Sequence, residues 1–350
     1  MKRGSPIRQS VALSVILLLL LFLMPLTGIA PSRTELFSGE LPLDETEGAP
    51  FVSGVWDGEM TLRVLQGDRV ETMDLGAYLA GVVRAEMPAS FEPEALKAQT
   101  VAARTYTLYK MKHGGNHGDT ADLCTDPSCC QAYLEQGQAR RNWGNLADAY
   151  EQKIEEAVRS TDGQVVLYGG EPILAVFHSS SAGRTRAAGD VWVNDLPYLQ
   201  AVESPENGDT IPNYYSRVEI PKEVFQKRVQ ALWPEADLSM GADGWLAQAA
   251  TDEAGSVETL LVGGVPVKGT ELRNALGLRS ACFTWEVQSE NLIFFVTGYG
   301  HGVGLSQYGA NRMAESGATW QEILNHYYTG VTVGPYRMTD LYNPGGIVVK

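Results

Sequence analysis

The sequence feature that most constrains the fold is a run of twenty uncharged, mostly apolar residues near the start, from Val11 to Ala30. Its length matches the apolar thickness of a bilayer, and the preceding Lys2, Arg3 and Arg8 favour the cytoplasmic side for that end. The run therefore predicts a single-pass membrane anchor, with the rest of the chain facing outward. A cleaved signal peptide is the competing interpretation, because Gly28-Ile29-Ala30 offers small residues to a peptidase.

The chain beyond the anchor, which we assign to residues 1–30, divides into a tether and an ectodomain. Residues 31–52 are rich in Pro, Glu, Gly and Ser, a composition typical of a mobile linker. We expect residues 53–340 to form one ectodomain, and a composition shift near residue 160 suggests two lobes. The formal charge of −15 has the wrong sign for binding phosphates, which argues against a nucleic-acid partner.

The hydrophobic periodicity of the ectodomain mixes the helical and the strand period, which predicts an α+β fold with antiparallel strands. Strand patterns occupy 60–65, the two halves of an expected hairpin at 164–168 and 173–178, and a second pair at 283–287 and 292–297. Helical patterns occupy 74–87, 93–112, 145–160 and 319–328, the last opening with a capping box of Thr319 and Glu322.

One carboxylate lies on the apolar face of the predicted helix 74–87. Glu86 is eleven residues beyond the first apolar residue, which at about 100° per residue returns it to within roughly 20° of the same direction. Burial raises the pKa of a carboxyl group, and so does a position in the last turn, which Pro88 fixes here. Glu86 is thus a candidate proton donor near neutral pH. The alternative is a structural ion pair with Arg104 or Lys97 from the next helix.

Three blocks of sequence resemble the signature of the stage II sporulation protein D family. They are Glu86-Met-Pro-Ala-Ser-Phe-Glu-Pro-Glu-Ala-Leu-Lys-Ala-Gln-Thr-Val-Ala-Ala-Arg-Thr-Tyr106, Phe177-His-Ser-Ser-Ser-Ala-Gly-Arg-Thr185 and Gly298-Tyr-Gly-His-Gly-Val-Gly-Leu-Ser-Gln-Tyr-Gly-Ala310. A Cys-rich segment ending in Cys130-Gln-Ala-Tyr133 accompanies them. The resemblance implies a peptidoglycan lytic transglycosylase whose catalytic acid, the Glu before Met-Pro, is Glu86.

The resemblance also implies how a single carboxylate suffices. In lytic transglycosylases the sixth-carbon hydroxyl of the muramic sugar attacks and closes an anhydro ring, and such an internal nucleophile has an effective molarity of about 10⁵ M or more. The implied substrate is peptidoglycan glycan strands stripped of stem peptides, cut during sporulation septal thinning and engulfment. The implied partners are a sporulation amidase or endopeptidase and a membrane scaffold, and the implied location is the cell membrane, facing the wall or septum.

The three blocks also supply an expected sugar groove. The loop after His178 is dense in hydroxyl and amide donors, as an uncharged polyhydroxyl ligand requires, and alternating glycines around His301 let backbone approach a ligand. Structural hydrogen bonding is the alternative role for both histidines. The expected groove residues are Lys97, Arg104, Tyr106, His178, Ser179, Ser180, Ser181, Gly183, Tyr299, Gly300, His301, Ser306, Gln307 and Tyr308.

A compact set of nitrogen and sulfur donors predicts a structural zinc site. His117, Cys124, Cys129 and Cys130 have the residue types that tetrahedral zinc prefers, and four protein ligands leave no open position. His113 competes with His117 for the fourth place, and a disulfide outside the cytoplasm competes with the metal. The remaining Cys282 lies in an apolar stretch and is expected to pack.

Two rival functions remain open from the sequence. A zinc amidase or peptidase would use the metal to activate water, although three sulfur ligands and the lack of an HExxH motif weaken that hypothesis. A non-enzymatic wall-binding or amidase-enhancing module is the second rival, because related domains occur in amidase modifier proteins.

Overall fold

The computed structural model describes residues 48–115, 117–192, 194–209 and 211–337, which fall in one compact unit. The predicted membrane run and most of the tether lie outside these residues. Within them, no helix combines the length and the apolar character that a bilayer crossing demands.

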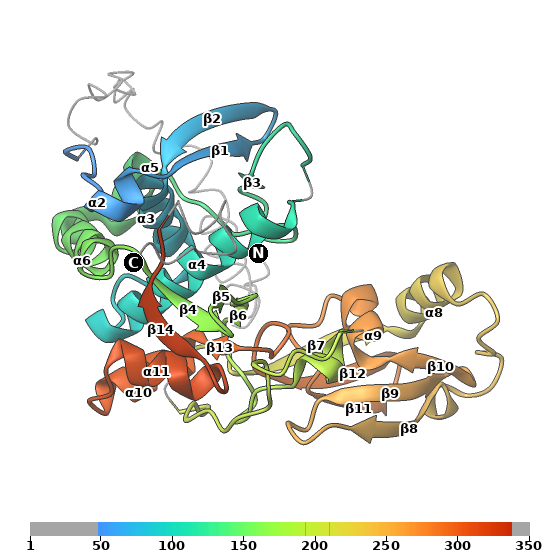
Figure 1. Ribbon diagram of the computed structural model, residues 1–350. Helices are drawn as coiled ribbons and strands as arrows, with labels where there is room; N and C mark the ends of the chain where they lie inside the picture. Colours follow the sequence, from blue (N-terminus) through green and yellow to red (C-terminus); the bar gives the residue numbers. More distant parts are fainter. Residues whose placement is uncertain (1–47, 116, 193, 210, 338–350) are drawn as a thin grey trace, which may run out of the picture. The chain divides into compact units, whose positions relative to one another are not determined.

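Helices and antiparallel strands both build the unit, which confirms the expected α+β class (Figure 1). The elements around the first of two hydrophobic cores are α2 (Val55–Gly58), β1 (Thr61–Gln66), β2 (Arg69–Asp74), α3 (Leu75–Glu86), α4 (Pro93–His113), β3 (Leu123–Cys124), α5 (Gln136–Trp143), the 3-10 helix η2 (Gly144–Leu146), α6 (Ala147–Ser160), β4 (Gln164–Tyr168), β5 (Glu171–Pro172), β6 (Phe177–His178), α7 (Ala188–Val191), β13 (Leu305–Ser306), α10 (Gln307–Glu315), α11 (Trp320–Tyr327) and β14 (Thr332–Pro335).

Helix α4 is central to the first core. Its small side chains, mainly Ala and Thr, are buried along most of its length and let α3, α6, α10, α11 and β4 pack against it. Helix α3 begins at Asp74, whose side chain accepts a hydrogen bond from the amide of Ala77 at 2.8 Å. Its apolar stripe is buried as the periodicity predicts, and it ends at Glu86 because Pro88 disfavours helix at the preceding residue.

Three small sheets accompany these helices. β1 pairs antiparallel with β2 and parallel with β3, and β4 lies between β14 and β5. β6 pairs in parallel with β13, with Phe177 opposite Leu305. This pairing corrects the expected hairpin: only Glu171 and Pro172 return along β4, whereas β6 joins a different sheet.

A second core is built from one continuous segment. Its elements are β7 (Tyr215–Pro221), α8 (Lys222–Leu232), the 3-10 helix η3 (Ala242–Gly244), β8 (Leu246–Thr251), β9 (Val257–Val262), β10 (Val265–Lys268), α9 (Gly269–Leu276), β11 (Phe283–Gln288) and β12 (Asn291–Thr297). The strands form two antiparallel sheets, β10-β9-β8 and β11-β12-β7, and Phe225 of α8 stacks on Trp245 within the second core.

The second core corrects the lobe boundary expected near residue 160. That position lies at the end of α6 inside the first core, and the second core instead begins near residue 218 and ends near residue 296. The first core resumes with Val303 and Leu305. The second lobe is thus an insertion into the first, which a composition shift does not reveal.

Candidate active site and metal centre

One pocket, with a volume of about 580 Å³, gathers segments that are far apart in the sequence. The end of α3, the loop before Gln131, strand β6, the loop after β12 and the start of α10 contribute to it. The lining residues are Ala85, Glu86, Tyr106, Pro127, Ser128, Cys129, Cys130, Gln131, Val176, Phe177, His178, Ser179, Tyr299, Gly300, His301 and Gln307.

Backbone hydrogen bonds hold two walls of this pocket together. Ser180 and Tyr299 form an antiparallel bridge, each amide donating to the other's carbonyl at 3.0 and 2.8 Å. Gly300 has a φ of 119°, and a Cβ there would lie 2.7 Å from the Cβ of His178. Only glycine permits this close approach, as the alternating glycines of the sequence indicate.

Among the described residues that line the pocket, Glu86 is the only carboxylate. It is half-buried, and its Oε1 accepts a hydrogen bond from the backbone amide of Ala132 at 2.8 Å. Desolvation raises the pKa of Glu86, although the Ala132 amide and the Gln307 side chain oppose that rise. The group is therefore biased toward its protonated form while one oxygen stays fixed in place.

The two basic residues expected near Glu86 have other partners. Arg104 is fully buried and binds Asp57 through two hydrogen bonds of 2.8 and 2.6 Å, and Lys97 pairs with Glu94 at 2.8 Å. Neither is among the residues that line the pocket, where the sequence had placed them, and their partners also differ from the alternative ion pair with Glu86. Arg104 instead stabilises the core, since its guanidinium also reaches the carbonyl of Gln164.

Both pocket histidines are neutral and internally bonded. His178 donates from Nδ1 to the carbonyl of Val303 and accepts at Nε2 from Ser181 Oγ, each at 3.2 Å. His301 accepts the Val303 amide at Nδ1 and donates from Nε2 to the carbonyl of Phe177. Desolvation lowers the pKa of His178 to about 3 and that of His301 to about 4. The two rings shape the wall and cannot serve as cationic acids near neutral pH.

Several residues that were expected in the groove do not line the pocket, and some of them form hydrogen bonds or contacts that support its walls. Ser179 lines the pocket, whereas Ser180, Ser181, Gly183, Ser306 and Tyr308 do not. Ser306 caps α10, from which Gln307 reaches the pocket, and Tyr308 packs edge-on against Phe91. Ser181 and Ser306 both donate to the buried carboxylate of Glu206.

Glu206 and Gln131 are polar residues that the sequence did not single out. Glu206 lies in a loop with no periodic pattern, and it ties the Ser181 loop to the cap of α10. Gln131 is buried, and its Oε1 accepts from Thr107 Oγ1 at 3.1 Å. Its Nε2 has no acceptor among the described residues. Because Gln131 lines the pocket, this amide can donate to a bound ligand. The sequence signal that could have indicated Gln131 as a site residue is its position next to Cys130.

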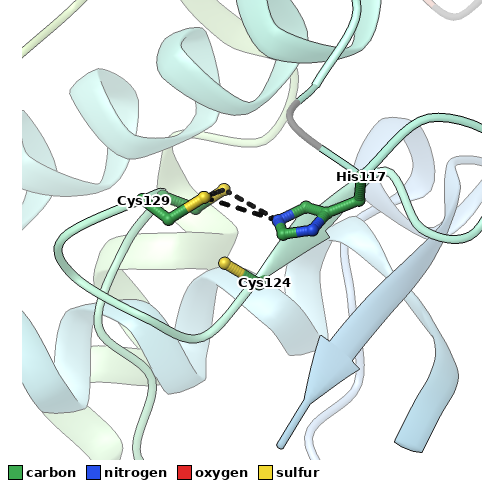
Figure 2. A group of neighbouring side chains, drawn as sticks. His117, Cys124 and Cys129 are labelled. Carbon is green, nitrogen blue, oxygen red and sulfur yellow. Dashed lines mark hydrogen bonds between the residues drawn. The ribbon is translucent and has the colours of Figure 1, made fainter. Parts of the chain in front are cut away.

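Four donor side chains cluster beside the pocket, as expected for a metal site (Figure 2). The imidazole nitrogen of His117 and the sulfurs of Cys124, Cys129 and Cys130 all lie within 4.8 Å of one another. The Cys129 sulfur is 3.5 Å from His117 Nε2 and 3.7 Å from the Cys130 sulfur. The amides of Cys129 and Cys130 both donate to the carbonyl of Asp126, which winds the loop so that the thiols converge.

The alternatives to this donor set lie apart from it. His113 stacks on Tyr109 and contacts its carbonyl at 2.9 Å, so His117 takes the fourth position. The cysteines are free thiols, which distinguishes this structure from the disulfide alternative. Cys282 is half-buried at the edge of the second lobe and outside the cluster.

Comparisons with known proteins match this chain to sporulation proteins. A family model described as "Stage II sporulation protein" matches residues 66–168. Stage II sporulation protein D of Bacillus subtilis (strain 168) is 35% identical over 266 residues, which cover 75% of each chain. That of Bacillus amyloliquefaciens is 36% identical over the same coverage. The amidase enhancer of Bacillus subtilis (strain 168) is 28% identical over 306 residues, 74% of this chain and 40% of that protein.

Proposed function

This chain belongs to the stage II sporulation protein D family, and we propose that it is a lytic transglycosylase that cuts peptidoglycan glycan strands. The observation that carries the proposal is Glu86, a half-buried carboxyl group of raised pKa and the only carboxylate that the part of the chain described by the structure contributes to a pocket of about 580 Å³. A pocket of this size fits sugar residues, and its lining offers uncharged donors such as Ser179 and Gln131.

The single carboxylate favours transglycosylation over ordinary hydrolysis. Glycosidases that hydrolyse need a second carboxylate to attack or to activate water. The pocket histidines do not take the role of this second carboxylate. Their ring nitrogens already form hydrogen bonds with backbone groups and with Ser181. An attacking hydroxyl supplied by the substrate removes the need for that second group.

Glu86 would act twice in one turnover. Its protonated carboxyl group first donates the proton to the leaving glycosidic oxygen. The sixth-carbon hydroxyl of the muramic sugar then attacks its own anomeric carbon, and the Glu86 carboxylate accepts the hydroxyl proton. The anhydro ring forms as the glycosidic bond breaks, so no water is consumed and Glu86 returns to its protonated state. The Ala132 amide holds Oε1 throughout.

We also propose that the four-residue cluster holds a structural zinc ion. Tetrahedral zinc, with Zn–S of about 2.3 Å and Zn–N of about 2.0–2.1 Å, sets its ligand atoms about 3.8 Å (S to S) and about 3.5 Å (S to N) apart. The distances of 3.7 Å between Cys129 and Cys130 and 3.5 Å between Cys129 and His117 fit these edges. Four protein ligands close the site, so the ion would stiffen the pocket wall that Cys129 and Cys130 form.

The proposed setting is a cell membrane during sporulation septal thinning and engulfment. The apolar run Val11–Ala30 would anchor the chain, with residues 53–340 facing the wall or septum. The glycan strands would have lost their stem peptides to a partner amidase or endopeptidase, and a membrane scaffold would hold the enzymes together. The amidase enhancer likeness favours one alternative, a non-enzymatic module that binds the wall or enhances an amidase.

The test incubates the full protein, and a Glu86→Gln variant, with peptide-free glycan strands and weighs the new ends by mass spectrometry. We expect anhydro ends with the native protein and none with the variant. Ends that have gained water would refute transglycosylation in favour of hydrolysis. Strands that both forms bind equally and neither cuts would instead establish the binding module.

A further inference from the structure

An arginine of the second lobe lies against the pocket. Arg279 places its guanidinium 4.0 Å above the ring of Tyr299, which lines the pocket and is 44% exposed. The backbone of Arg279 is fixed to the same wall, because the amide of Gly300 donates to its carbonyl at 3.0 Å. Tyr299 in turn is bridged to Ser180, so the stacked pair has a rigid base.

The guanidinium of Arg279 has spare donors. It forms no ion pair or side-chain hydrogen bond with any residue in the described ranges, and its buried Nε has no acceptor there. Nearby arginines differ, since Arg186 pairs with Asp252 at 2.5 Å and Arg184 with Glu253 at 3.0 Å. Stacking uses only the face of a guanidinium, which leaves its N–H groups free at the edge for a planar acceptor.

Arg273 lies near both Tyr299 and Arg186, and desolvation lowers its pKa, whereas Asp252 pairs with Arg186. An unsatisfied cation beside a sugar pocket indicates a ligand that carries an anion. A guanidinium edge best fits a carboxylate, which it binds through two parallel hydrogen bonds.

We propose that Arg279 is a specificity-determining residue that binds the free lactyl carboxylate of a muramic sugar in the glycan strand. This inference rests on the proposed function, because it takes a muramic-containing strand as the ligand. When a stem peptide is attached, that carboxylate becomes an amide and loses its charge, and Arg279 loses its partner. The interaction therefore selects strands from which the stem peptides have been removed.

The experiment compares two forms of one substrate on the full protein. The first is peptide-free glycan strands, and the second is the same strands with the muramic carboxyl groups converted to methyl esters, which removes the charge with little added bulk. A charge-assisted hydrogen bond predicts about tenfold to a hundredfold higher kcat/KM for the native strands. Arg279→Gln should lose this preference, and Arg279→Lys should keep part of it, because it retains charge without the planar fork.

Arg217→Gln is the matched control, because it removes one exposed arginine from β7 of the same lobe without touching the pocket. It should keep the full preference for native strands. Equal rates of the wild type on native and esterified strands would overturn the inference, and so would an undiminished preference in Arg279→Gln.

A failure of the proposed catalysis would leave this test intact. If the wild type cuts neither substrate, the dissociation constants of both strand forms take the place of rates. A tenfold preference for native strands that Arg279→Gln abolishes would then support the carboxylate site in a binding protein. Equal binding of both forms by the wild type would refute it.

Discussion

Replacing Glu86 with glutamine separates the chemical role of this residue from its place in the fold. The glutamine Oε1 can keep the hydrogen bond from the Ala132 amide, so the substitution changes the ability to transfer a proton and leaves that contact in place. Because Glu86 would serve both as acid and as base, we expect a loss of about 10³-fold or more in kcat.

The same substitution should make the protein more stable at neutral pH. Burial raises the pKa of Glu86 in the folded state above its value in the unfolded chain. The stabilising effect of its bound proton is therefore complete at pH values below the unfolded pKa, and is lost as the pH rises through the folded pKa. Each unit by which the pKa is raised corresponds to about 1.4 kcal/mol, or about 2–4 °C in melting temperature for a domain of this size.

Thermal unfolding at a series of pH values between 4 and 8 measures this effect. The two proteins should melt at similar temperatures near pH 4, where both side chains are uncharged. The advantage of Glu86→Gln should then grow toward pH 8. A constant difference in melting temperature across the series, or a variant that is less stable at pH 8, would refute the conclusion that the carboxyl group of Glu86 is buried and poorly solvated. Retained cleavage by the variant would refute its catalytic role.

Three further changes test other parts of the structure. Removing metal with a chelator, or replacing His117 with alanine, should lower the melting temperature and abolish bound zinc in elemental analysis; a metal-free protein of unchanged stability would contradict the site. Asp57→Asn leaves Arg104 buried without its charged partner and should cost about 3–5 kcal/mol in urea unfolding, with no change in KM, whereas a raised KM would return Arg104 to the groove. Gly81→Ala would press a methyl group onto the Tyr133 ring and should cost about 1–3 kcal/mol; full stability would show that the ring can move aside.

Local patterns in the sequence predicted the parts of the fold that local physics controls. The stripe of α3, the long α4 and the capping box that starts α11 at Thr319 all follow from periodicity and end signals within one segment. The metal cluster was predictable for the same reason, since its four ligands lie within fourteen positions.

The parts that long-range contacts decide were not predictable from the sequence. β6 is two residues long and owes its existence to β13, more than a hundred positions later, so its strand-like pattern was assigned to the wrong partner. Arg104 was placed in the groove because it lies in the same block as Glu86, whereas its carboxylate partner, Asp57, lies in the four-residue helix α2, which is too short to show a periodic pattern. The Glu206 loop and the boundaries of the inserted lobe likewise depend on contacts between residues that are far apart in the sequence.

The inserted second lobe has a consequence for how the protein matures. The chain enters the second core near residue 218 and leaves it near residue 296, and next to this boundary the amide of Gly298 donates to the carbonyl of Tyr214 at 2.9 Å. During synthesis Glu86 on α3 emerges long before the opposite wall of the pocket, and the hydrogen bond that Gln99 accepts comes from Gln307, 208 positions downstream. A nascent or truncated chain therefore carries Glu86 without the pocket walls opposite it, and the proposed cleavage would require nearly the whole polypeptide.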